Sequence, residues 1–131
     1  MHPGPLLARA LGALDEGPRE RVSLYLPSRD AQGRPVDTNP WIAEAEALLT
    51  RIAGGATVLP PSSGAWCPHP GEALVREQVV QAYAFATAQA ISDALPLLRS
   101  FLHRLGRETG QGEVACEIGG LLFRIRDFDP A

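Results

Sequence analysis

Apolar residues recur at every second position in several short segments of this chain, a pattern that a β-strand buried on one face keeps along its length. The first segment is 22–26, where valine and leucine alternate with serine and tyrosine. The longest is 74–86, and its small residues share one face, where we expect helices to pack closely: Val80, Ala82, Ala84 and Ala86. The opposite face would carry Tyr83 and Phe85, together with Tyr25 of the first segment.

Shorter strands are predicted elsewhere. Residues 114–118 and 121–125 alternate in the same way, and Gly119-Gly120 between them is typical of a two-residue hairpin. Residues 57–59 predict a short strand that enters a loop at 60–64. Trp66 and Cys67 would continue that strand beyond the loop.

Two helices are predicted between these strands. The first begins at Asn39-Pro40, because asparagine caps free amides and proline suits the first helical turn. It ends at Gly54-Gly55. The second begins at a cap supplied by Thr87 or Ser92, runs to about Arg107, and tolerates Pro96 near its start or with a kink. Each carries an apolar stripe, formed by Trp41, Ala45, Leu48, Leu49 and Ile52 in the first and by Leu98, Phe101, Leu102 and Leu105 in the second.

The resulting order is β-α-β-β-α-β with one added C-terminal strand. This order predicts an α+β, ferredoxin-like fold, an antiparallel sheet with both helices on one face. The length of 131 residues favours one domain, which we place at 21–131. Residues 1–20 would form an N-terminal amphipathic helix and a linker, and we expect the helix to dock on the domain or on a partner.

Composition excludes several classes of function. The formal net charge of −3 disfavours a general nucleic-acid binder, which needs basic residues to replace phosphate counterions. No apolar run reaches the ~20 residues of a membrane span, and the N-terminus does not resemble a signal peptide, so we expect a cytoplasmic protein. The two cysteines, Cys67 and Cys116, do not imply a disulfide, and with His69 and His103 they form no recognisable zinc spacing. We therefore expect no metal and no cofactor.

Two segments are rich in motif-like residues. Residues 54–77 contain GGATVLP, GAW and RE in that order, and residues 107–114 read RETGQGEV. Together they resemble a family of short bacterial proteins of unknown function that share a GGAT-x-x-P…G-x-W…RE pattern and a later RET-x-QGEV pattern. The resemblance covers about Arg21 to Phe128 and leaves the N-terminal helix outside. It implies a bacterial protein and supplies no mechanism.

These segments and the second helix supply the candidate ligand-binding residues. The candidates are Trp66, Arg76, Glu77, His103, Arg107, Glu108, Gln111 and Glu113. The functional interpretation places them around a ligand at one edge of the sheet. The structural interpretation makes 107–113 a tight turn whose charges pair locally, and Trp66 a plug at the end of the core. Arg99, His103 and Arg107, spaced four residues apart, form a basic stripe that is either a solvated helix face or an anion site.

Three functions are compatible with this pattern. We favour an interaction or ligand-binding module that self-associates through its sheet, with Tyr25, Tyr83 and Phe85 at the interface. The expected partner is a second copy or another protein, and a small molecule is possible. The first alternative is a small enzyme with its site between Trp66, Arg76, Glu77, His103 and the 107–113 turn. The second is a nucleotide-binding sensor that uses the basic stripe. Convergence of the candidate residues on one cleft would favour an enzyme, and their dispersal would favour an interaction module.

Overall fold

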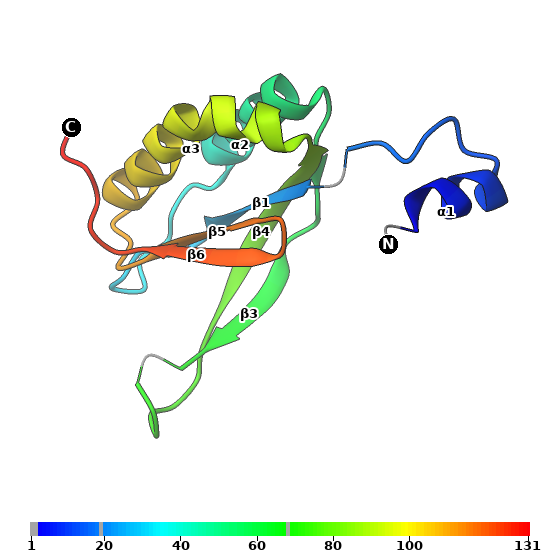
Figure 1. The fold of residues 1–131 in the computed structure, drawn as a ribbon. Coiled ribbons are helices and arrows are strands. Elements are labelled where there is room, and N and C mark those ends of the chain that lie inside the picture. Colours follow the sequence, from blue (N-terminus) through cyan, green and yellow to red (C-terminus); the bar gives the residue numbers. More distant parts are fainter. Residues whose placement is uncertain (1–2, 19, 68) are drawn as a thin grey trace.

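The computed structural model describes residues 3–18, 20–67 and 69–131 as a six-stranded antiparallel sheet with two helices packed on one face (Figure 1). The strands lie in the order β2-β4-β1-β5-β6, and β3 pairs with the first part of β4. The elements are α1 (Gly4–Leu11), β1 (Glu20–Pro27), α2 (Asn39–Ala53), β2 (Thr57–Val58), β3 (Ser62–Trp66), β4 (Val75–Ala86), α3 (Ala88–Glu108), β5 (Val114–Ile118) and β6 (Leu121–Ile125). This is the ferredoxin-like α+β fold that the sequence predicts, with β6 as the added strand.

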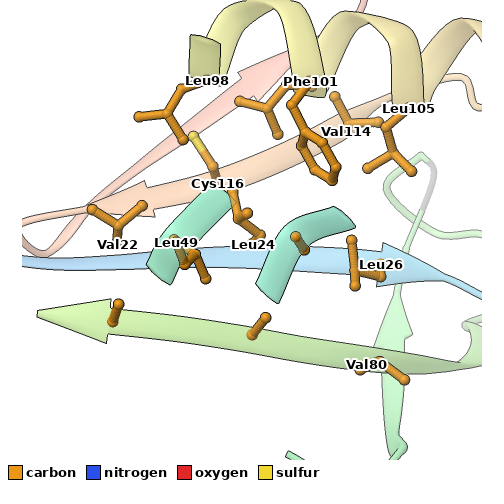
Figure 2. Close-up of a cluster of buried hydrophobic side chains, with 14 of the residues drawn as sticks. Val22, Leu24, Leu26, Leu49, Val80, Leu98, Phe101, Leu105, Val114 and Cys116 are labelled. Carbon is orange, nitrogen blue, oxygen red and sulfur yellow. The ribbon is translucent and has the colours of Figure 1, made fainter. Parts of the chain in front are cut away.

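The core lies between the sheet and the two helices. β1 is central, because it pairs with β4 over its whole length, from Glu20↔Ala86 to Pro27↔Val79, and with β5 on its other edge. Its inward residues Val22, Leu24 and Leu26 are almost fully buried. Figure 2 shows the side chains of β1, β5, α2 and α3 meeting in one cluster. Ala82 and Ala84 of β4 are buried as well, and their small side chains let α2 lie close to the strand.

The helix termini agree with the sequence in part. Thr87 caps α3, since its hydroxyl accepts a hydrogen bond from the Ala90 amide at 3.1 Å. Gly54 ends α2 in the left-handed region, with φ of 83°, where a side chain would be strained. Asn39 does not act as the predicted cap. It lies inside the first turn of α2, and its own amide donates to the Asp37 carboxylate.

The predicted loop at 60–64 is wrong in most of its length. Residues Ser62–Trp66 form β3, which pairs with β4 from Ser62↔Val79 to Trp66↔Val75. The reason is a difference in strand length. β4 has 12 residues, whereas β2, which pairs with Tyr83 and Ala82 on the edge of β4 away from β1, has 2, so the first part of that edge is free to pair with β3. β3, the start of β4 and the loop between them project beyond the helices, and we call them the hairpin arm (Figure 1).

The helix α1 stands apart from the sheet in Figure 1, and its leucines Leu6, Leu7 and Leu11 are exposed. The expected docking on the domain is therefore not seen in the single chain, and docking on a partner stays a prediction. Within the described ranges, none of the helices has both the length and the apolarity needed to cross a membrane.

Candidate functional site

The face of the sheet that the helices do not cover carries the predicted aromatic residues. The register places Tyr25 opposite Gln81, Ser23 opposite Tyr83 and Arg21 opposite Phe85. Tyr83 and Phe85 contact each other edge to face, with ring centroids 6.1 Å apart. We call this surface the open face, and it confirms the predicted placement of the three aromatic residues. Their role in an interface stays a prediction.

A row of hydrogen-bonded polar side chains crosses the open face. Arg21 donates from Nε and Nη2 to the Glu117 carboxylate at 2.8–3.1 Å. The Ser23 hydroxyl donates to the same carboxylate at 3.3 Å, and Gln81 donates to the Ser23 oxygen at 3.4 Å. The hydrogen bonds from Arg21 hold the pKa of Glu117 below its usual value, so this carboxylate is ionised at neutral pH. These hydrogen bonds link side chains of β1, β4 and β5 across the open face.

An open cavity of about 500 Å³ lies where the loop after β1 meets the base of the hairpin arm. It brings together Arg76 and Glu77, two of the predicted site residues, with Arg29. Burial raises the pKa of the Glu77 carboxyl, and the charge of Arg29 partly opposes this shift. The remaining lining residues are Ser28, Pro35, Ser63 and Gln78.

The turn after α3 holds the loop that carries Arg29. Gln111 donates from Nε2 to the Arg29 carbonyl oxygen at 2.8 Å, and the Gly110 carbonyl accepts from the Ala31 amide at 2.9 Å. Gly110 has φ of 64° and lies against the Asp30 side chain, so this approach favours glycine. The RETGQGEV segment therefore fixes the position of a residue that lines the cavity, although its own side chains are absent from the lining.

The other predicted site residues do not converge on this cavity. Trp66 lies on the hairpin arm, opposite Val75, and its exposed fraction is 51%. Arg107 and Glu108 approach each other to 3.9 Å, and Glu113 pairs with Arg126 of the C-terminal segment at 2.9 Å. The first contact is a local pair of the kind that the structural interpretation of the turn predicts, whereas the partner of Glu113 lies outside the turn.

The basic stripe of α3 contacts the C-terminal segment of the chain. Arg99 donates to both carboxylate oxygens of Asp129 at 2.8 Å, and Arg107 donates to the Asp129 carbonyl oxygen at 2.7 Å. His103 is buried and accepts the Asp129 amide proton at Nδ1, at 2.7 Å. The ring of Phe128 packs against His103 and leaves no room for a Cβ on Gly106. We call Phe128 and Asp129 the C-terminal latch. His103 is therefore covered, whereas Arg99 stays exposed to solvent while its guanidinium is paired with Asp129.

The latch predicts a loss of stability at acidic pH. Arg99 lowers the pKa of Asp129 below its reference value of 3.8, so the contribution of this carboxylate is complete above that value and is lost as the pH falls through the lower folded-state pKa. Urea unfolding between neutral pH and acid should therefore show a steeper decline for the native chain than for Asp129→Asn. Equal declines would mean that Asp129 is not paired in solution.

Sequence reasoning missed Arg29 and an apolar groove. The sequence around Arg29 predicts a polar loop and carries no signal that this loop approaches β4.

The apolar groove, about 400 Å³ in volume, lies between β6 and the start of α3, and exposes Leu95, Leu121 and Phe123. A signal was present here, since Leu121, Leu122 and Phe123 are consecutive apolar residues, which a strand cannot bury on one face alone.

The cysteines are both free, Cys67 exposed on the hairpin arm and Cys116 buried in the core. In the ranges that the structure describes, no cluster of histidine, cysteine and carboxylate side chains is arranged to hold a metal ion.

Comparison with known proteins gives similarity in fold. No protein-family model matches the chain, and no curated protein matches its sequence. Among solved structures, a phage SAM lyase in complex with S-methyl-5′-thioadenosine superposes with a TM-score of 0.61 at 15% identity, covering 85% of this chain and 92% of that one. A phage SAM lyase in the apo state gives a TM-score of 0.57 at 14% identity, covering 85% of this chain and 91% of that one. The divalent cation tolerance protein CutA1 of Thermus thermophilus gives 0.48 at 16% identity, covering 84% and 86%. Similarity at this level of identity concerns the fold alone.

Proposed function

We propose that this protein is a self-associating module whose copies pack through the open face of the sheet. The observation that carries the proposal is the combination of exposed apolar side chains with polar side chains that are hydrogen-bonded to one another on that face. Phe85 is 49% exposed and Leu122 is 62% exposed, and between them lies the hydrogen-bonded row that ends at Gln81. A surface rich in aromatic residues and arginine, with few unpaired charges at its centre, has the composition of a protein interface.

The hairpin arm also supports self-association. A two-stranded hairpin is marginally stable in water unless another surface supports it. Much of the arm receives no support from the helices, and its apolar residues Trp66, Leu74 and Val75 are exposed. Trp66 and Val75 lie on the same side of the sheet as Tyr83, because they share the register of the outward residues of β4. A second copy that covers the open face would therefore cover this part of the arm as well.

The small-enzyme and nucleotide-sensor alternatives have less support. The enzyme would need Trp66, His103 and Glu77 in one cleft, whereas His103 lies under the C-terminal latch. The sensor would need a free basic stripe, whereas Arg99 and Arg107 bind Asp129. The fold shared with phage SAM lyase makes S-methyl-5′-thioadenosine a useful compound to include in ligand screens of this chain.

The test is the mass of the assembly in solution. Native mass spectrometry should show a homo-oligomer for the unmodified chain and a monomer for Tyr83→Asp, because the substitution places an unpaired charge at the centre of the interface. The thermal stability of the monomeric fold should change little, since Tyr83 is only partly buried in the single chain.

Leu97→Asp provides the matched control, because Leu97 is 40% exposed on α3, on the helical side of the molecule. It adds the same charge and should leave the assembly unchanged. A monomeric unmodified chain, or a Tyr83→Asp variant with the mass of the unmodified assembly, would refute the proposal.

A further inference from the structure

The helix α1 carries an apolar stripe that the described residues of the single chain leave uncovered. Leu7 and Leu11 lie one turn apart on this helix, and Leu6 lies beside them. All three side chains are exposed. A helix of eight residues is too short to be stable in water by itself, so α1 needs a surface on which its leucines can pack.

The apolar groove between β6 and α3 is a surface of the required kind. Leu95 of α3 lines it together with Leu121 and Phe123 of β6, and all three are exposed. The register places Leu121 opposite Ile118, so these side chains of β6 lie on the helical side of the sheet. Amphipathic helices bind to grooves of this type by laying their apolar face into them.

The charges of the two surfaces are complementary. Arg9 is the charged residue of α1, and it follows Leu6 by three positions, so its side chain lies at the border of the leucine stripe. Among the described residues that line the groove, Glu20 alone is charged. Neither Arg9 nor Glu20 forms an ion pair with another described residue. Docking of α1 would therefore bring opposite charges together beside an apolar contact.

The linker holds α1 away from the groove of its own chain. Residues 12–19 join α1 to β1, which begins at Glu20, and they can span up to about 26 Å. The described part of this linker, 12–18, is exposed, and α1 stands beyond the end of the sheet at which β1 begins (Figure 1). A second copy can therefore receive the helix, and the exchange of an identical element between copies is a low-cost way to join them.

The groove adjoins the surface that we propose for self-association. β6 is an edge strand, so the open face and the groove lie on the two sides of one strand. Leu122 lies on the open face, opposite Glu117, whereas its neighbours Leu121 and Phe123 line the groove. Exposed apolar surface thus continues around β6 from one side to the other. A copy that packs on the open face would lie beside this edge, within reach of the linker.

We propose that, within the assembly, α1 of one copy docks its leucine stripe in the apolar groove of a second copy. This inference rests on the proposed self-association, because a helix of eight residues buries too little surface to hold two copies together without the open face. Exchange in both directions would cover the stripe and the groove of each copy at once. It would also explain why both surfaces are exposed in the single chain.

Disulfide trapping tests the contact on the full chain. Cys67→Ser first removes the exposed native thiol, since Cys116 is buried. Leu7→Cys and Leu121→Cys are then combined in one chain, which is treated with oxidised glutathione and weighed under non-reducing conditions. Exchange should join two chains covalently. Leu7→Cys combined with Leu97→Cys is the matched control, because Leu97 is half-exposed on α3 outside the groove lining, and it should cross-link at least about tenfold more slowly.

Two further substitutions connect the cross-link to the proposed contact. Leu11→Asp, added to the double-cysteine chain, should lower the initial rate of cross-linking at least about tenfold, because docking would bury an unpaired charge. It should leave the mass of the assembly unchanged, since the open face is intact. Tyr83→Asp should abolish the cross-link, because it separates the copies.

Three results would overturn the inference. The first is a monomeric chain with an internal disulfide, which would mean that α1 docks on its own chain. The second is equal cross-linking of the two cysteine pairs. The third is an intact assembly, shown by native mass spectrometry, in which no cross-link forms. That result would refute the helix contact and leave the open-face proposal standing, whereas a chain that is monomeric before oxidation would refute both.

Discussion

Leu24→Ala should lower the free energy of unfolding by about 2–5 kcal/mol, the range measured for large-to-small substitutions at fully buried leucines. Leu24 has no exposed surface and lies on the central strand, opposite Ala82 of β4 and Cys116 of β5. β1 is hydrogen-bonded on both edges, so the surrounding side chains cannot collapse into the space that the substitution leaves. For a domain of this size the melting temperature should fall by roughly 7–18 °C.

Urea unfolding at fixed protein concentration measures this effect, since an assembly would make the midpoint depend on concentration. Leu97→Ala is the control, because Leu97 is half-exposed on α3 and its truncation should cost no more than about 0.5 kcal/mol. Equal midpoints for the two variants would contradict the central position of β1.

Removal of residues 128–131 should destabilise the domain by about 2–3 kcal/mol, from the exposure of apolar surface under Phe128 and the loss of a hydrogen bond to a buried group. The ring of Phe128 packs on His103 and over Gly106. His103 is buried, and the truncation removes the Asp129 amide whose hydrogen bond its Nδ1 accepts. The ion pair of Asp129 with Arg99 is exposed and adds little to this sum.

A chain that lacks only Pro130 and Ala131 is the matched control, because both residues are exposed and neither takes part in the latch. Thermal melts of the two truncated chains should differ by several degrees, and the shorter truncation should match the full chain. Identical melts would mean that the latch is open in solution.

The strands and helices were predictable where periodicity was strong. Alternation specifies which face of 22–26 and of 74–86 is buried, and the apolar stripe does the same for α3. The fold follows from the order of these elements. The hairpin arm was not predictable in this way. Ser62 and Ser63 have no apolar alternation and become a strand only because the longer β4 leaves hydrogen-bonding groups free at its start.

The candidate sites show the same division. Tyr83 and Phe85 follow from strand alternation, so their placement on the open face could be derived. The position of Arg29 beside Arg76 and Glu77 at one cavity could not, because it depends on contacts between the 28–35 loop, the turn at Gln111 and β4, which are distant in sequence. The partner of the basic stripe was hidden for the same reason, since nothing near His103 in the sequence indicates Asp129.

The order in which the core closes has a consequence for synthesis. β1 is made early, but it obtains its first neighbour only when β4 has been translated and its second only when β5 follows. The latch that covers His103 is translated later still. Until these residues have left the ribosome, the apolar stripe of α3 and one edge of β1 stay uncovered. Exposed apolar surfaces and unpaired strand edges of this kind are prone to aggregate. The core of this domain therefore closes late in synthesis, although its central strand is among the first parts to be made.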